Sequence, residues 1–196
     1  MTTSQTLKSP LITLASSSPR RRELLDQIQV SYDVYPVNID ESHLPGESAV
    51  QFVKRLAVEK ARAGYEKFPE RPALGSDTIV VYGQHILGKP RDKQMAIEML
   101  SMLSGKTHSV MTAVAIYSDK HQHCALSTSE VEFTELNLQQ IETYCESGEP
   151  LDKAGAYAIQ GLAAKFIKNI HGSYSGIMGL PLFETGELLK KAGIVL

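Results

Sequence analysis

The stretch Leu11-Ile12-Thr13-Leu14-Ala15-Ser16-Ser17-Ser18-Pro19-Arg20-Arg21-Arg22 passes from mainly apolar residues to serines, and then to a proline followed by three arginines. Its apolar beginning, Leu11–Ala15, predicts a strand, and the serines that follow interrupt that strand. Beyond Pro19, apolar residues recur at helical spacing and predict a helix over Arg20–Gln27 that begins near the proline. A strand, a polar loop and a helix in this order are typical of α/β folds.

The remainder of the chain continues this alternation. Strands are predicted over Tyr32–Val37, Pro72–Tyr82 with a hairpin return at Ile86-Leu87, Ser109–Tyr117, Ala125–Leu136 and Phe166–Ile170. Helices are predicted over Ser48–Gly64, Asp92–Ser104, Leu138–Glu146 and Leu182–Ala192. We therefore expect an α/β domain with a central mixed β-sheet flanked by helices. No repeat or long linker divides it, so one two-lobed domain is expected over residues 1–196, with residues 1–10 as a flexible N-terminus.

Composition limits the classes of function. The 196 residues are 42% hydrophobic and 21% charged, which is typical of a packed globular domain. A formal net charge of -2 favours neither a nucleic-acid nor an anionic-membrane partner. Cys124 and Cys145 lie in no metal-binding or disulfide pattern. The polar N-terminus precedes an apolar run too short for a secretion signal or membrane span, so we expect a cytoplasmic protein.

The junction Ser16–Arg22 combines hydroxyls, arginines and the start of a helix. A helix N-terminus presents unpaired N–H groups and a partial positive charge, and guanidinium groups fit phosphate oxygens. These residue types indicate an anion site. An ordinary capped helix with solvated arginines explains the same pattern equally well.

Asp77 is the second candidate, because it immediately precedes the β-branched run Thr78–Val81, which should be buried. A buried acid is costly unless it pairs, binds a metal or faces a cleft, although aspartate also caps turns readily. Asp40 and Glu41 could bring further carboxylates to the same cleft.

Two further segments hold potential ligand contacts. Lys89 and Arg91 place cations between a hairpin and a helix. The segment Asp152–Gly161 is rich in small residues and contains one polar amide, Gln160. Small residues let a ligand approach closely, but a tight connection would look the same.

Two familiar motifs are absent. Gly105-Lys106-Thr107 resembles the end of a phosphate-binding P-loop, but Leu100 stands where the first glycine is required. Gly172-Ser173-Tyr174-Ser175-Gly176 has tyrosine at the place of a serine nucleophile, so His171 supports a serine hydrolase only weakly.

Taken together, the chain resembles the Maf family of nucleotide pyrophosphatases from Leu14 to about Leu189. The resemblance rests on motifs that occur in family order: Ala15-Ser16-Ser17-Ser18-Pro19-Arg20-Arg21, Asp40-Glu41, Leu56-Ala57-Val58-Glu59-Lys60-Ala61, Gly75-Ser76-Asp77-Thr78, Gly88-Lys89-Pro90-Arg91, Leu103-Ser104-Gly105-Lys106-Thr107-His108 and Gly179-Leu180-Pro181-Leu182. At Arg20, Thr78 and Gln160 it resembles the subgroup that acts on dTTP and UTP, so these three are the expected specificity residues.

The resemblance implies a Maf/ITPase-like fold with an active-site cleft between two lobes, often in a homodimer. It also implies hydrolysis of a nucleoside triphosphate, dTTP, UTP or a modified pyrimidine nucleotide, to the monophosphate and diphosphate. The expected cofactor is Mg²⁺ or Mn²⁺ with Glu41 and Asp77 as ligands, because these ions prefer oxygen donors. Asp77 is also the expected catalytic base. The expected substrate- and phosphate-binding residues are Ser16, Ser18, Arg20, Arg21, Lys60 and Lys89.

Two other interpretations stay open. The same cleft could belong to a regulator of cell division that senses a nucleotide without turnover, or to an enzyme of this fold that removes purine triphosphates such as ITP. Asp77 and Lys89 favour an enzyme, because a sensor needs no base beside a water. His108, His171 and Tyr157 are candidates to line the cleft, with core or surface positions equally compatible.

Overall fold

A computed structural model describes residues 11–195 of the chain; the expected flexible N-terminus, 1–10, lies outside this range. The strands are β1 (Ile12–Leu14), β2 (Tyr32–Val34), β3 (Ala73–Tyr82), β4 (His85–Leu87), β5 (Thr107–Tyr117), β6 (Gln122–Phe133) and β7 (Ile167–His171). The helices are α1 (Pro19–Gln27), α2 (Ala49–Lys67), α3 (Lys93–Leu103), α4 (Leu138–Glu146), α5 (Tyr174–Met178) and α6 (Leu182–Lys191). Three short 3₁₀ turns are η1 (Glu149–Asp152), η2 (Ala154–Ala156) and η3 (Leu162–Phe166).

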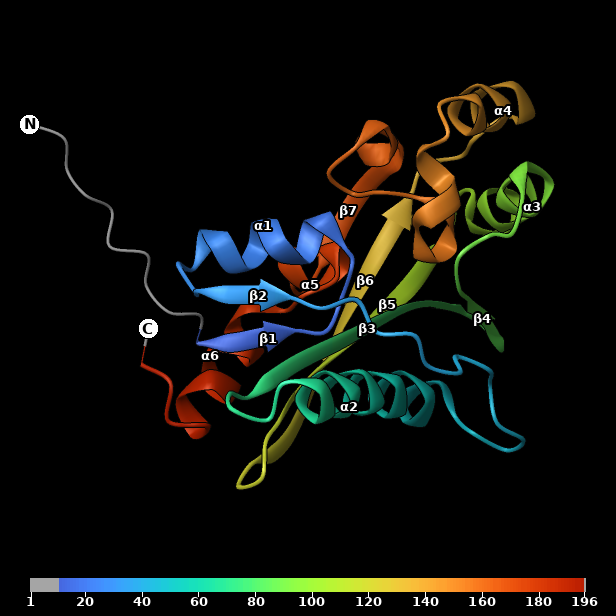
Figure 1. The fold of residues 1–196 in the computed structure, drawn as a ribbon. Coiled ribbons are helices and arrows are strands. Elements are labelled where there is room, and N and C mark those ends of the chain that lie inside the picture. The colour runs from blue at the N-terminus through green and yellow to red at the C-terminus, as the bar shows by residue number, and fades with distance from the viewer. Residues whose placement is uncertain (1–10, 196) are drawn as a thin grey trace, which may run out of the picture.

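All seven strands form one mixed sheet, which confirms the predicted α/β class. The order is β2-β1-β3-β5-β6-β7, with β4 paired to β3. β1 pairs in parallel with β2 and β3, whereas the remaining pairs are antiparallel. The long strands β3, β5 and β6 run through the whole molecule, and the shorter strands extend the sheet at either end (Figure 1).

The helices cover both faces of the sheet. α2 lies along one face, whereas α1 and α5 lie on the other (Figure 1). The small side chains of Ala57 and Ala61 on α2 pack against Ile79 of β3 and Ala113 of β5. On the opposite face, Leu25 of α1 joins a cluster with residues of β1, β3, β5 and α6. A third cluster joins α3 and α4 to the far ends of β5 and β6. The three clusters together form the hydrophobic core of the described residues.

A gap in strand pairing along β3 creates the place for a site. β1 pairs with β3 only at Ala73 and Leu74, and β4 pairs with it only from Val80 onward. Between them, over 75–79, β3 pairs with β5 alone among the described strands. The Leu74 carbonyl accepts the Ala15 N–H, so alternation along the ladder directs the backbone groups of Ser76 and Thr78 toward this gap.

Sequence patterns located the long elements correctly. Ser48 caps α2 in a capping box with Gln51, as its position predicted, and α2 continues one turn beyond the expected end to Lys67. Asp92 caps α3 by accepting the Met95 N–H. β2 is shorter than expected and ends at Val34. The preceding helix also excludes a P-loop at Gly105, because α3 runs to Leu103 and Gly105 ends it with φ +65°.

The segment 147–181 holds what the sequence analysis missed. It contains η1, η2, η3 and the five-residue helix α5, none of which was predicted. Elements this short complete too few turns to show a helical period. Among the described residues, no helix combines the length and apolar character needed to cross a membrane.

Candidate active site

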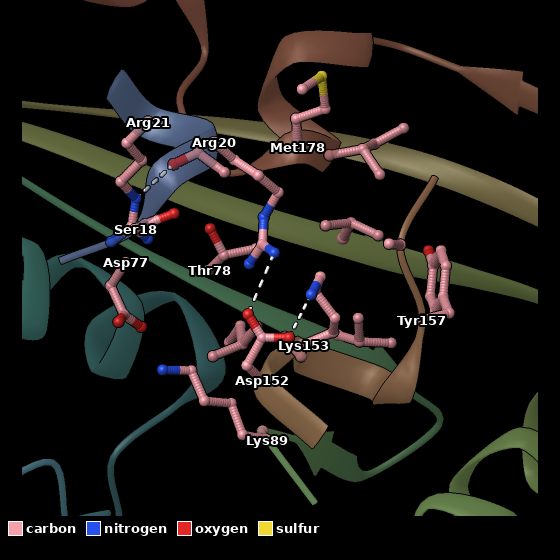
Figure 2. Close-up of a pocket in the computed structure, with 18 of the residues that line it drawn as sticks. Ser18, Arg20, Arg21, Asp77, Thr78, Lys89, Asp152, Lys153, Tyr157 and Met178 are labelled. Carbon is pink, nitrogen blue, oxygen red and sulfur yellow. Dashed lines mark hydrogen bonds and ion pairs between the residues drawn. The ribbon is translucent and has the colours of Figure 1, made fainter. Parts of the chain in front are cut away.

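A pocket of about 350 Å³ opens at the gap along β3. It has a charged end formed by Arg21, Glu41, Lys60, Asp77 and Lys89, and an adjoining hollow at this end is lined by Ser16, Ser17 and Ser18. Its apolar end is formed by Val80, Val110, Tyr157, Ile159, Ile177 and Met178. Figure 2 shows Asp77, Ser18 and Arg21 on one side, Tyr157 on the other, and Arg20, Thr78, Asp152 and Lys153 between them.

Lys60 is the centre of the charged end. It lies on the face of α2 that packs on the sheet and is only 8% exposed. Its ammonium contacts Oδ1 of Asp77 at 2.7 Å and Oε1 of Glu41 at 2.7 Å. Both carboxylates are therefore held around one buried cation. Because Asp77 is itself 8% exposed, loss of Lys60 would leave a buried acid without its partner.

The two carboxyl groups differ in their surroundings. Burial raises the pKa of Asp77, and Glu41 adds to this effect, while the positive charges of Lys60 and Arg21 oppose it. Partial burial also acts to raise the pKa of Glu41, but its hydrogen bond to Lys60 and the charges of Lys60, Lys89 and Arg21 outweigh this and lower it. The pKa values of the two carboxyl groups are thus shifted in opposite directions.

Arg21 is fixed by neutral groups. Its Nε donates to the Gly179 carbonyl at 2.8 Å and its terminal N–H to Ser16 Oγ at 3.0 Å. Ser76 Oγ lies 2.9 Å from the same Gly179 carbonyl. Burial lowers the pKa of Arg21, yet a guanidinium stays protonated in proteins. Because no carboxylate of residues 11–195 forms an ion pair with it, Arg21 keeps its charge available to an anion.

Arg20 and Lys153 meet across the pocket through Asp152. Arg20 comes from the start of α1 and Asp152 from η1, and their ion pair spans 3.5 Å (Figure 2). Lys153 contacts the other carboxylate oxygen of Asp152. Asp152 is 62% exposed, so water screens these contacts and they contribute little to stability.

An aromatic cluster supports the apolar end. Tyr157 donates or accepts a 2.9 Å hydrogen bond with Nε2 of His108, and Phe133 packs edge-on against both rings. His108 is 3% exposed and its Nδ1 has no partner among the described residues. Burial lowers the pKa of His108 to about 4, so the imidazole is neutral at pH 7.

The structure brings the sequence-predicted site residues together. Nine of them line the pocket: Ser18, Arg20, Arg21, Glu41, Lys60, Asp77, Thr78, Lys89 and Gln160. Ser16 lines the adjoining hollow. Among the other candidates, Tyr157 lines the pocket, His108 lies behind it, and His171 is exposed on β7. Asp40 is exposed and accepts the Ser42 N–H, whereas its neighbour Glu41 reaches Lys60. The roles assigned to these residues remain predictions.

Several pocket residues were not predicted. Asp152 and Lys153 were noticed only as part of a small-residue loop, and Gly179 only as part of a motif. Thr112 of β5, which lies behind Thr78, received no mention. The sequence could have indicated Asp152 as a site residue, because it is an acidic side chain among small residues. Nothing in the sequence distinguishes Thr112 from other residues of a β-branched strand.

The amino-acid sequence of the chain is similar to those of known proteins. The family described as Maf-like protein matches residues 11–192. The chain is 53% identical over 188 residues to a dTTP/UTP pyrophosphatase of Alkalilimnicola ehrlichii, covering 93% of each chain. It is 51% identical over 178 residues to a dTTP/UTP pyrophosphatase of Escherichia coli O157:H7, covering 90% of each. A solved structure, the Ham1 protein of Staphylococcus aureus, has 13% identity and a TM-score of 0.47, with 79% of this chain and 90% of that one covered. On the family match and these sequence identities, the chain belongs to the Maf-like protein family.

Proposed function

We propose that this chain hydrolyses nucleoside triphosphates, with dTTP and UTP as substrates, to the monophosphate and pyrophosphate. The name dTTP/UTP pyrophosphatase, carried by relatives at about half identity, supports this substrate class. The observation that carries the proposal is the charged end, where Arg21 and Lys89 stand beside the Glu41–Lys60–Asp77 cluster. Phosphoryl chemistry requires positioning and charge stabilisation of this kind more than covalent catalysis.

The charge balance of the pocket suits a triphosphate with a divalent cation. Five cations line it, Arg20, Arg21, Lys60, Lys89 and Lys153, against three carboxylates, Glu41, Asp77 and Asp152. The excess of positive charge favours a polyanion. The apolar end next to it suits a nucleoside.

The donor set also fits Mg²⁺ or Mn²⁺. The described residues hold no group of three or more His, Cys, Asp or Glu side chains around one point. Mg²⁺, however, is commonly held by one or two carboxylates together with substrate phosphates and waters. Glu41 and Asp77, whose oxygens both contact Lys60, would supply those carboxylates. The ion would neutralise phosphate charge as a Lewis acid.

Within this proposal Asp77 is the base. Its carboxylate accepts a proton from the attacking water, the water oxygen bonds to the α-phosphorus, and the bond from that phosphorus to the bridging oxygen breaks. Pyrophosphate then leaves with the electron pair of that bond. Lys60 holds Asp77 in place at 2.7 Å, while Arg21 and Lys89 neutralise the phosphates. Arg20, Thr78 and Gln160 contact the nucleoside and set substrate preference.

A panel of nucleoside triphosphates tests the proposal directly. Pyrophosphate release is measured for dTTP, UTP, CTP, GTP and ITP, with Mg²⁺, with Mn²⁺ and with chelator. Release from dTTP and UTP that requires the metal is the expected result. Faster release from ITP would favour a purine-clearing enzyme. Tight nucleotide binding without release from any nucleotide would favour the regulator of cell division and contradict the proposal.

We also propose an oligomeric state and a cellular location for the protein. The first is a homodimer, which size-exclusion chromatography with light scattering would test. The second is a cytoplasmic location, which cell fractionation would test.

A further inference from the structure

Glu41 lies in a long loop, segment 35–48, which joins β2 to α2. The loop runs out past the N-terminal end of α2 before the chain turns back into the helix (Figure 1). The Glu41 side chain is 54% exposed, so packing alone does not fix it. Ordering such a loop costs conformational entropy. Other contacts must therefore hold Glu41 within 2.7 Å of Lys60.

Arg55, on α2, binds this loop directly beside Glu41. Its Nε donates to Glu47 Oε1 at 2.7 Å and its Nη2 to Glu47 Oε2 at 2.9 Å, so the ion pair is bidentate. The same Nη2 donates to the carbonyl of Ser42 at 2.9 Å. Ser42 follows Glu41 in the chain, and adjacent Cα atoms are only about 3.8 Å apart. Fixing Ser42 therefore limits where the Glu41 side chain can lie.

Glu47 is a firm anchor because the start of α2 holds it. It directly precedes Ser48, which caps the helix in a capping box. Its Oε2 accepts the Leu44 N–H at 3.2 Å, and its own N–H donates to the Leu44 carbonyl at 3.1 Å. The hydrogen bonds from Arg55 lower the pKa of Glu47 to about 2, so this carboxylate is charged at neutral pH. Segment 42–47 is thus folded around one carboxylate that Arg55 binds.

The guanidinium shape suits this arrangement. Nη1 of Arg55 contacts Glu59 Oε2 at 3.2 Å, one turn further along α2, so three groups hold the guanidinium at once. A guanidinium presents five N–H donors in a rigid plane, whereas the ammonium of a lysine is a compact point charge. Isolated ion pairs on a surface contribute little, but a bidentate pair within a network is an exception.

We propose that Arg55 is a positioning residue for Glu41: by fixing segment 42–47 to α2, it holds the Glu41 carboxylate beside Lys60. The consequence for catalysis rests on the proposed function. Arg55 is not among the described residues that line the pocket, so it acts through Glu41 and not by touching the substrate. Helix α2 thereby supplies both the buried cation of the charged end and the side chain that brings a carboxylate to it.

Hydrogen exchange tests the positioning without any nucleotide. Exchange of the Leu44 and Glu47 amides is compared in the parent chain, in Arg55→Gln and in Arg62→Gln. The control breaks the ion pair of Arg62 with Glu66, 2.7 Å long and spaced i,i+4 on the same helix. Exchange should quicken on the order of tenfold in Arg55→Gln alone. Equal exchange in all three chains would overturn the inference.

A third variant establishes which contact holds the loop. Glu41→Gln weakens the contact with Lys60 but leaves the hydrogen bonds of Arg55 in place, so the Leu44 and Glu47 amides should exchange as in the parent chain. If Glu41→Gln loosens the segment as much as Arg55→Gln does, the Lys60 contact holds the loop and the inference is wrong.

The amides of β3 and β5 report on global stability in the same experiment. They should exchange at the parent rate in Arg55→Gln. If they also quicken, Arg55→Lys replaces it, because lysine keeps the charge but loses the planar fork. In Arg55→Lys the faster exchange should be confined to segment 42–47, and an effect spread over the whole sheet would contradict a positioning role.

Kinetics test whether the position of the loop matters for turnover. Under the proposed function Glu41 is a metal ligand, so Glu41→Gln should raise the Mg²⁺ concentration that gives half-maximal pyrophosphate release. Arg55→Gln should raise the same constant on the order of tenfold, because loss of a group that orients a ligand weakens metal binding. Arg62→Gln should leave it unchanged.

Two other outcomes have distinct meanings. If Arg55→Gln slows release without moving whichever constant Glu41→Gln moves, Arg55 acts by another route and the inference is wrong. If the parent chain releases no pyrophosphate from any nucleotide, the proposed function fails instead. The exchange of the Leu44 and Glu47 amides then still decides whether Arg55 holds the segment.

Discussion

The two ends of the pocket are built in different ways. At the charged end, specific polar partners hold the central side chains: Asp77 and Glu41 hold Lys60, and Ser16 and Gly179 hold Arg21. At the apolar end, the Tyr157 side chain has one polar contact among the described residues, to His108, and is otherwise placed by packing. Charge fixes the chemistry at one end, and shape fixes the ligand at the other. Substitutions at the two ends of the pocket should therefore have different effects on the protein.

Asp77→Asn should have the largest effect. It keeps the size of the side chain but removes both the base and the charge paired with Lys60. Pyrophosphate release from dTTP should fall roughly 10³-fold while the fold persists. Steady-state kinetics and circular dichroism measure the two properties. Near-normal release would remove Asp77 from the chemistry and leave the charged end as a binding site only.

Gly75→Ala should damage the charged end through its scaffold. A Cβ at Gly75 would lie 2.4 Å from the Ala57 carbonyl oxygen and 2.4 Å from the Ala61 nitrogen, both backbone atoms of α2. The helix would have to move away from β3, separating Lys60 from Asp77. The free energy of unfolding should fall by ~3 kcal/mol in urea titrations. Gly88→Ala is the stability control, because its methyl group meets nothing within 4 Å.

Acid should weaken the apolar end through His108. The folded-state pKa of His108 is about 4, below the value of about 6.5 in an unfolded chain. Above pH 6.5 the imidazole is neutral in both states and its contribution to stability is complete. As the pH falls from 6.5 toward 4, only the unfolded chain takes up the proton, so stability is lost.

The expected loss attributable to His108 between pH 7 and pH 5 is about 2 kcal/mol. Urea unfolding at both pH values measures it. His108→Gln, which cannot ionise, should show a smaller pH dependence, whereas His85→Gln, at an exposed position, should match the parent chain. If His108→Gln and the parent depended on pH equally, His108 would not be the buried neutral group.

Asp152→Asn should have the smallest effect. Asp152 joins the two ends by holding Arg20 and Lys153, but it is largely exposed. Stability should change by less than about 1 kcal/mol, and KM for dTTP by roughly twofold, because water screens such pairs. Thermal melts and kinetics at low and high salt measure both. A loss of turnover as large as in Asp77→Asn would show that the two carboxylates act together.

The sequence was most informative where local chemistry decides structure. Two predicted helices begin at Ser48 and Asp92, and these residues cap α2 and α3; caps act over a few residues, so a local pattern can locate them. The candidates Arg21 and Asp77 were found for the same reason, since each residue type is unusual in its local setting. The Arg21 hydrogen bond to Gly179 joins residues far apart in the chain, so no local pattern shows it.

Other features depend on contacts that only the fold creates. Lys60 looks like any solvated lysine on a helix, and only the resemblance pointed to it, yet α2 buries it against β3. Thr112 belongs to an ordinary β-branched strand, and only the fold brings its hydroxyl to Thr78 and to the Gly176 carbonyl. α5 is too short to show a period but supplies the Gly176 carbonyl. To predict these contacts, one must know which strands pair and in which register.

The gap along β3 has a consequence for solubility as well. An unpaired strand edge is a template on which a second chain can add a strand and begin aggregation. Here the edge over 75–79 is short and recessed, and it is flanked by the like charges of Arg21, Lys60 and Lys89. An incoming strand would have to desolvate the same cations that prepare the pocket for an anion, which disfavours pairing. Neutralising them together would make the chain more prone to precipitate.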